Sequence, residues 1–330
     1  MDKELRNRYF EALDEELTKL MDFKTGMLSE KYSEVIDCPL CKSTIKKQRK
    51  LFVKNGFIFV KCESCGMIFT NPQVSPRALE ECYGNSKAND LWVEVQESAK
   101  EQIWKKDYYV QQIELLTKYI DKPNLDLIDI GCSSGYFLEI LREHRPEWIA
   151  KGIELNTRAY HYAARKNLDV EQKLLNELDE NQKFDIFTLF GVLEHLSNPQ
   201  TILEDIISHS KSSSYVLTIV PNAYSLYHMF LQTKSVSFDG RNHLLYFSEK
   251  TLTKLFQDND FEIIHLDTVL TGLDNIKRQI QWFGPYEDID NMKYIPDKLE
   301  YLFGDGKAED LILQHNLGLR LRMLAKFKSK

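Results

Sequence analysis

One stretch constrains the fold of this chain more than any other, and it runs from Leu125 to Phe137 (LDLIDIGCSSGYF). An apolar run ends at Gly131, a second glycine follows at Gly135, and a helical pattern begins at once. This pattern predicts a buried strand, a tight turn and a helix whose first amides face a ligand. The next apolar run ends near Glu154, where a carboxylate can bind the two hydroxyls of a ribose. We therefore predict a nucleoside site at the crevice of a doubly wound, Rossmann-like α/β sheet.

The spacing of the two glycines indicates which nucleoside binds. Dinucleotide sites use Gly-x-Gly-x-x-Gly, in which the second glycine lets the backbone approach a pyrophosphate. Here Cys132, Ser133 and Ser134 separate the glycines, and no third glycine appears before Tyr136. A cofactor without phosphates makes no such demand on the turn, so the spacing favours S-adenosylmethionine. A dinucleotide and a ligand-free α/β domain are the alternatives.

These motifs, together with later ones, resemble the successive motifs of class I S-adenosylmethionine-dependent methyltransferases. The resemblance covers about residues 105–270 and implies the seven-stranded sheet of that family. Ser133 is a departure, because the family commonly has glycine at this position. The matching segments are 129–135 (DIGCSSG), 152–154 (GIE), 184–185 (FD), 192–199 (VLEHLSNP), 220–222 (VPN) and 243–248 (HLLYFS).

The resemblance implies a role for each residue of the cofactor site. Glu154 should bind the ribose, with Leu155 beneath the adenine, and Phe190 should lie against the methionine moiety. Asn176 and Glu177 are candidates for the edge of the adenine. The residues expected around the amino acid end of the cofactor are Asp129, Gly131, Cys132, Ser133 and Gly135.

Four of the six cysteines form two Cys-x-x-Cys pairs, Cys38 with Cys41 and Cys62 with Cys65. Two such pairs can place four thiolates around one Zn²⁺ ion, and a site with four cysteine ligands is closed and structural. Between the pairs, two β-rich runs flank Asn55-Gly56, a strong hairpin signal. We therefore predict a zinc ribbon over residues 36–70. Disulfides are the alternative, which a reducing compartment disfavours.

Composition and charge limit the function classes. With 330 residues, of which 43% are apolar, the chain can build a sizeable core. A net charge of −7 argues against broad nucleic-acid binding. The opening Met-Asp-Lys-Glu-Leu-Arg has no apolar run, so we expect no secretory signal. No run reaches the roughly 18 to 20 apolar residues that a membrane span needs. We expect a cytoplasmic protein.

The expected organisation has five parts. The C-terminal part, residues 271–330, ends in a run at 317–327. We expect this run to form an edge strand with one polar face; a basic amphipathic tail at a membrane surface is the alternative. The aromatic residues before it are expected to cap a substrate pocket, form a homodimer interface or pack in the core. The parts are an N-terminal helical segment (1–35), the zinc ribbon (36–70), a helical connector (71–123), the methyltransferase core (124–270), and the aromatic insertion with the final strand (271–330).

His195 and His243 are the candidate general bases, and we add Glu194 to the catalytic candidates. His195 follows Glu194 just past the fourth strand, at the carboxyl edge where ligands bind such sheets. His243 follows a connection, 222–242, that is long enough to act as a lid. A histidine with a pKa near neutrality can remove a proton from a hydroxyl. A histidine beside a helix start often only binds backbone, and this structural role is the alternative for both.

The order of ribbon, Phe-Thr-Asn-Pro (69–72) and core resembles that of sugar methyltransferases of deoxysugar and surface-glycan pathways. The resemblance implies that Tyr83, His195 and His243 line the acceptor site. That group often has glutamate where this chain has Asn242, so C- and O-methylation both stay open. Some quinone-pathway O-methyltransferases bind a divalent ion through a glutamate three residues before the Glu-His pair, but this chain has Gly191 there, and we predict no catalytic metal.

We therefore predict methyl transfer from S-adenosylmethionine to a hydroxylated small molecule, with a nucleotide-activated sugar or glycan precursor as first choice. The alternatives are a zinc-ribbon RNA methyltransferase and a non-catalytic, partner-binding pseudo-methyltransferase. A salt-sensitive affinity for RNA would favour the first of these.

Overall fold

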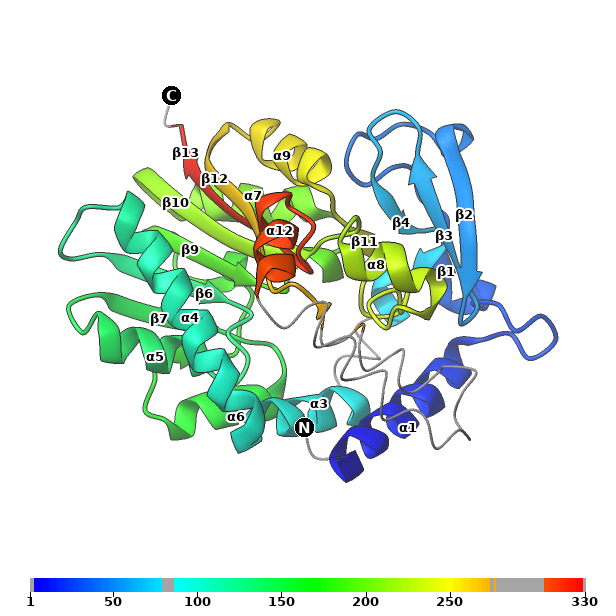
Figure 1. The fold of residues 1–330 in the computed structure, drawn as a ribbon, viewed down its shortest axis with the longest axis horizontal. Helices are drawn as coiled ribbons and strands as arrows, with labels where there is room; N and C mark the ends of the chain where they lie inside the picture. Colours follow the sequence, from blue (N-terminus) through cyan, green and yellow to red (C-terminus); the bar gives the residue numbers. More distant parts are fainter. Residues whose placement is uncertain (1–2, 79–85, 274–275, 277–305, 329–330) are drawn as a thin grey trace.

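The computed structural model describes residues 3–78, 86–273, 276 and 306–328 (Figure 1). Cys82, Tyr83 and residues 277–305, which include most of the aromatic insertion, lie outside the described residues. None of the described helices has the length and apolar character needed to cross a membrane.

A seven-stranded sheet forms the larger part of the protein, in the order β12-β13-β10-β9-β6-β7-β8. Neighbours from β8 to β10 are parallel, and β13 is antiparallel to both β10 and β12. The chain runs outward from β6 in both directions, so the crevice lies at the carboxyl ends of β6 and β9. This confirms the predicted doubly wound fold. The strands are β6 (Asp126–Ile130), β7 (Ile149–Ile153), β8 (Val170–Glu171), β9 (Phe184–Phe190), β10 (Ser210–Pro221), β12 (Phe261–Val269) and β13 (Arg320–Phe327).

Helices cover both faces of this sheet because successive strand residues point to opposite sides. Leu127 of β6 packs in one core with helices α4 and α5, whereas Ile128 packs in another with α7 and α9. The remaining helices lie at the carboxyl edge or connect the parts (Figure 1). The helices are α1 (Lys3–Leu20), α3 (Lys87–Glu97), α4 (Ala99–Tyr119), α5 (Tyr136–His144), α6 (Thr157–Arg165), α7 (Pro199–Ser208), α8 (Leu226–Leu231), α9 (Glu249–Gln257) and α12 (Lys307–Gln314).

The expectation that the final strand lies at an edge is wrong. β13 lies between β10 and β12 and pairs with β10 from Tyr215↔Lys326 to Pro221↔Arg320. Four of its apolar residues, Leu321, Met323, Leu324 and Ala325, are fully buried. The alternation of residues predicts which side chains share a face, but it carries no information about which strands flank them. A tail on a membrane surface is also excluded, since this segment is paired on both sides.

The N-terminal helix is shorter than the expected 1–35. α1 ends at Leu20, because the carboxylate of Asp22 accepts hydrogen bonds from the backbone N–H groups of Lys24 and Thr25 and starts a turn. Gly26, at φ 66°, completes the reversal. The following chain forms β1 (Ser33–Glu34), which pairs with β5 (Gln73–Val74).

The cysteine-rich residues 36–70, which we call the cysteine segment, form a second sheet in the order β11-β4-β3-β2. The predicted hairpin is present, with Asn55 and Gly56 both at positive φ between β2 and β3. One strand of this sheet, β11, comes from the distant chain just after His243. The strands are β2 (Gln48–Lys54), β3 (Phe57–Cys62), β4 (Ile68–Thr70) and β11 (Leu245–Tyr246).

Candidate active site

The turn between β6 and α5 is held against the end of β7. The backbone N–H groups of Gly131 and Cys132 both donate to the carbonyl of Ile153, at 2.9 and 3.0 Å. A Cβ on Gly135, whose φ is 75°, would lie 2.4 Å from Leu168, so only glycine fits there. Ser133 has φ 51°, a conformation that favours glycine, which explains the glycine common in the related motif.

Glu154 fixes the shape of this turn with its carboxylate. Oε2 accepts from the backbone N–H of Ser133 at 2.8 Å, and Oε1 accepts from that of Asn156 at 2.7 Å. Burial raises the pKa of Glu154, while these hydrogen bonds oppose the rise. A carboxylate has lone pairs for about four hydrogen bonds, so Glu154 can still accept from two ribose hydroxyls. The adjacent Leu155 is 57% exposed, as the floor of an uncovered base site would be.

Asp129 is a buried carboxyl without a compensating cation. It is 2% exposed, and no described lysine, arginine or histidine forms an ion pair with it. Its Oδ1 accepts from the hydroxyl of Thr188 at 2.6 Å. Burial raises its pKa to about 7, although the Thr188 hydrogen bond acts the other way. A positively charged ligand group, such as the ammonium of an amino acid, would compensate this carboxylate.

Aromatic rings line the space beyond Asp129. Phe190 contacts Phe137 and Tyr109, with ring centroids 4.9 and 5.7 Å away. Tyr109, on α4, is a site residue that the sequence reasoning missed, because nothing local marks which face of that helix meets the crevice. Asn176 is exposed on a 3₁₀ turn, and the carboxylate of Glu177 accepts from the backbone N–H of Leu174. Neither residue forms a hydrogen bond or ion pair with the turn or with Glu154 among the described residues.

The two candidate histidines lie side by side. Their ring centroids are 4.9 Å apart in an edge-to-face arrangement. Nδ1–H of His195 donates to the carbonyl of Asn242 at 2.8 Å, and Nδ1–H of His243 donates to that of Ser237 at 2.9 Å. Since a carbonyl can only accept, each Nδ1 carries the hydrogen and each Nε2 holds a lone pair. Burial lowers the pKa of His195 to about 3 and that of His243 to about 4.

Two carboxyls accompany the histidines. Asp239, which the sequence reasoning missed, has Oδ2 3.8 Å from Nδ1 of His243, and its Oδ1 accepts from the backbone N–H groups of residues 241–243. A carboxyl therefore lies near His243 although residue 242 is asparagine. Glu194 is 1% exposed, and its Oε2 has no hydrogen-bond partner among the described residues. Burial raises the pKa of Glu194 to about 7.

Ligand atoms of Glu194, His195 and His243 lie within 4.8 Å of one another, which is close enough to hold a cation. Arg320 lies beside them, however, and its positive charge contributes to the low pKa of both histidines. This fixed charge opposes a second cation in the same space.

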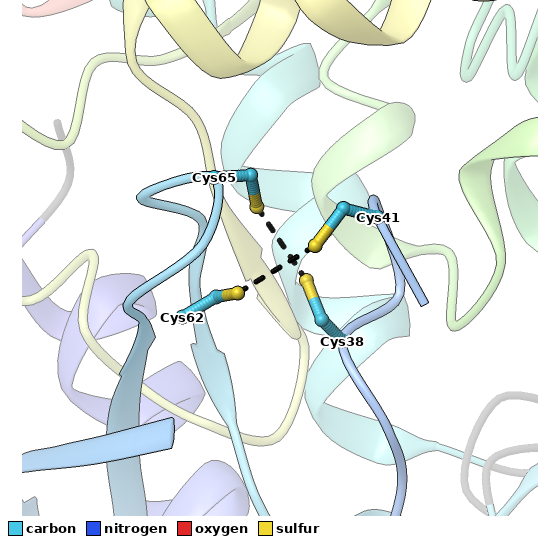
Figure 2. Close-up of side chains that lie close together, drawn as sticks. All are labelled: Cys38, Cys41, Cys62 and Cys65. Carbon is cyan, nitrogen blue, oxygen red and sulfur yellow. Dashed lines mark hydrogen bonds between the residues drawn. The ribbon is translucent and has the colours of Figure 1, made fainter. Parts of the chain in front are cut away.

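The four cysteines converge in the cysteine segment (Figure 2). Sγ of Cys38 lies 3.6 Å from that of Cys65, and Sγ of Cys41 lies 3.6 Å from that of Cys62. All four are free thiols, since a disulfide would bring two sulfurs to about 2.05 Å. Zinc–sulfur bonds of about 2.3 Å in a tetrahedron separate the sulfurs by about 3.8 Å, so the spacing fits one Zn²⁺ ion.

Comparison with known proteins bears on this site. Residues 103–266 match the model of a family described as "Methyltransferase domain". The chain is 26% identical over 106 residues to the mitochondrial ubiquinone biosynthesis O-methyltransferase of Candida albicans, a match that covers 29% of this chain and 32% of that protein. The match therefore spans about a third of the length of that curated relative.

Two solved structures share the fold. The plantazolicin methyltransferase BpumL in complex with SAH is 16% identical, with 76% of this chain and 94% of that chain covered and a TM-score of 0.50. The magnesium protoporphyrin IX methyltransferase from Synechocystis PCC 6803 with bound SAH is 12% identical, with 77% and 100% covered and a TM-score of 0.50.

Proposed function

Since residues 103–266 are a methyltransferase domain on the class I S-adenosylmethionine-dependent fold, we propose that this protein transfers a methyl group from S-adenosylmethionine to a hydroxyl of a small molecule. The observation that carries the proposal is the pairing of two carboxyls at one turn. Glu154 braces the Ser133 turn and keeps lone pairs for a ribose, while Asp129 lies buried without a cation. A ligand with a ribose and an ammonium group would satisfy both.

When bound, the cofactor supplies a methyl group on a positively charged sulfur that an acceptor oxygen can attack in line. The chain's own part is to orient the acceptor and take its proton. We propose His195 and His243 as the bases. Burial lowers their pKa to about 3 and about 4, not the near-neutral value assumed from the sequence, so both rings are neutral at neutral pH. The Asp239 carboxylate beside Nδ1 of His243 would stabilise that ring once it is protonated. Phe190 and Tyr109 would shield the methyl group from water.

For the acceptor we propose a nucleotide-activated sugar or glycan precursor. The support is the order of the cysteine segment and the core, and the matching positions Tyr83, His195 and His243. The fold itself does not select an acceptor, because the relatives named above are a ubiquinone-pathway, a plantazolicin and a magnesium protoporphyrin IX methyltransferase. Cytoplasmic location and a homodimer stay predictions.

We further propose that Cys38, Cys41, Cys62 and Cys65 hold one structural Zn²⁺ ion. Four sulfurs at tetrahedral spacing leave no open position for water or substrate. Three of the four are buried in a core shared with Phe187 of β9 and Leu252 of α9. The ion would therefore stabilise the junction between the cysteine segment and the seven-stranded sheet.

The test of the cofactor is calorimetric titration of the zinc-loaded protein with S-adenosylhomocysteine. Glu154→Gln keeps the shape of the side chain but weakens hydrogen bonds worth about 1.5 to 3 kcal/mol each, so the affinity should fall by about 10- to 100-fold. Glu171→Gln is the matched control, since that carboxylate pairs with Lys151 of the neighbouring strand β7 and with Lys173 just after β8. A folded, metal-loaded wild type that does not bind S-adenosylhomocysteine would refute the proposal.

A methyl-transfer assay distinguishes an active enzyme from a non-catalytic pseudo-methyltransferase. With radiolabelled S-adenosylmethionine, nucleotide sugars should become methylated by the wild type, and His243→Gln should lose most of that activity while keeping its affinity for S-adenosylhomocysteine. RNA methylated in place of nucleotide sugars, with an affinity that falls steeply with salt, would identify the RNA methyltransferase instead.

A further inference from the structure

Two arginines on β13 share one face of the strand but differ in their partners. Arg322 is neutralised, because its Nε donates to Asp267 at 2.9 Å and its Nη1 donates to Gln112 at 3.1 Å. Arg320 is half-buried, and no described residue forms an ion pair or a hydrogen bond with its guanidinium group. It pairs through its backbone with Pro221 and Val269, so it stands at the carboxyl edge of the sheet, where ligands bind.

The Arg320 guanidinium faces the catalytic cluster across the space beside Gly191. A Cβ on Gly191 would lie 3.4 Å from Oε1 of Glu194 and 3.8 Å from Nη1 of Arg320. Apart from the residues next to Gly191 in the chain, no other described atom lies within 4 Å of that Cβ position. The Glu194 carboxyl and the Arg320 guanidinium therefore both border the space beside Gly191, but they do not form an ion pair with each other. The charge of Arg320 also reaches both histidine rings.

The described charges around this cation compensate it only in part. Arginine stays protonated in proteins, so its positive charge is permanent. Glu194 forms no ion pair with it among the described residues. Burial raises the pKa of that carboxyl to about 7, although the charge of Arg320 opposes the rise, so it is only partly ionised at neutral pH. Asp239 already accepts three backbone hydrogen bonds. A half-buried guanidinium with five donors, none of them bonded to a described residue, is arranged to receive an anion from outside the chain.

We propose that Arg320 binds an anionic group of the acceptor, a carboxylate or a phosphate placed within about one sugar ring of the hydroxyl that is methylated. This inference rests on the proposed function and narrows it, since an acceptor of this site must then be an acid. A guanidinium binds either group through two parallel hydrogen bonds. A neutral sugar would leave the Arg320 donors unpaired in a half-buried space.

The test compares three probes on zinc-loaded protein saturated with S-adenosylhomocysteine. Glucose, glucuronate and glucose 1-phosphate present the same ring without a charge, with a carboxylate and with a phosphate. Dissociation constants from ligand-observed NMR should be at least about tenfold lower for one of the acids than for glucose. Arg320→Gln should abolish that preference, and Arg320→Lys should keep part of it.

Lys326→Gln is the matched control, because it removes one positive charge from the far end of the same strand, where Lys326 stacks on Tyr215. It should leave the preference unchanged. Preference for glucuronate identifies a carboxylate, and preference for glucose 1-phosphate identifies the phosphate of an activated sugar. The inference is overturned if the wild type binds glucose as tightly as both acids, or if Arg320→Gln retains the preference. Failure of the wild type to bind S-adenosylhomocysteine, seen before any probe is added, overturns the proposed function itself.

Discussion

Replacing Asp129 with asparagine should stabilise the ligand-free protein and abolish binding of the cofactor. The Asp129 carboxyl is 2% exposed and is held by one hydrogen bond, from Thr188. Asparagine has nearly the same shape, and its amide oxygen can accept the same hydrogen bond. The variant therefore removes the buried charge with little change in packing. A gain in stability with a loss of function is what we expect of a group kept for a ligand.

The magnitude follows from the pKa of Asp129, which burial raises from 3.8 to about 7. A carboxyl with a folded pKa above its unfolded pKa contributes stability that is fully present below pH 3.8 and is lost as the pH rises through about 7. Between pH 5 and pH 8 this loss amounts to about 2.5 kcal/mol in the free energy of unfolding. Asparagine does not titrate, so the stability of Asp129→Asn relative to wild type should grow by that amount.

Urea unfolding of both ligand-free, zinc-loaded proteins at pH 5 and pH 8 measures this difference. Other titrating groups, Glu194 among them, are present in both proteins and cancel when the two are compared. A difference in unfolding free energy that does not change with pH would refute the assignment of a raised pKa to Asp129. Calorimetry completes the test, because S-adenosylhomocysteine, which carries an ammonium group, should bind the wild type and not the variant.

Three further predictions concern the neighbouring groups. Gly191→Ala places a Cβ 3.4 Å from Glu194 at a φ of 72°, so methyl transfer should fall at least about tenfold while calorimetry finds the affinity for S-adenosylhomocysteine unchanged. Thr188→Val removes the hydrogen bond that lowers the pKa of Asp129, so ¹³C NMR of that carboxyl should report a higher pKa than in the wild type. Removal of Zn²⁺ with a chelator should increase hydrogen exchange in β11 and β4 but not in β6, which mass spectrometry can localise; equal protection with and without the metal would contradict this.

The parts of the site that could be predicted from the sequence are those set by local chemistry. The glycine turn at 131–135, Glu154 at the end of the next strand, the Asn55-Gly56 hairpin and the two cysteine pairs each depend on neighbouring residues. The backbone in these places has few alternatives, because positive φ angles and ligand spacing restrict it. The structure places these residues in the expected elements.

The missed features depend on contacts between distant segments. Asp239 stands four residues before His243, but the sequence drew attention to Asn242 because it adjoins the histidine. The Leu-Arg-Leu-Arg alternation at 319–322 places Arg320 and Arg322 on one face, yet it cannot show that Asp267 neutralises one and leaves the other beside Glu194. The partners of the two arginines depend on the insertion of β13 between β10 and β12. The periodicity of the sequence does not encode strand order.

The same long-range contacts explain why a small cysteine segment accompanies the catalytic cluster. The backbone N–H of Leu244 donates to the carbonyl of Glu194 at 2.8 Å, and the carbonyl of Leu244 accepts from Thr70 of β4 at 3.1 Å. Leu244 thus links the cysteine segment to Glu194, directly beside His243. The cysteine segment also holds the connection before His243, because Phe238 packs against Phe59 of β3 with ring centroids 5.7 Å apart.

A segment of this size has too small a core to be rigid alone, so the stability of these contacts depends on what holds its loops together. Binding of one Zn²⁺ ion by the four thiolates would contribute about 10 kcal/mol or more to the folding free energy of the cysteine segment. β11 pairs with β4 through Leu245↔Phe69 and Tyr246↔Ile68, and so transmits this rigidity to the backbone that carries His243. The cysteine segment is therefore placed to position the acceptor-site histidine, whereas the cofactor turn and Glu154 are braced by β6 and β7 independently of it.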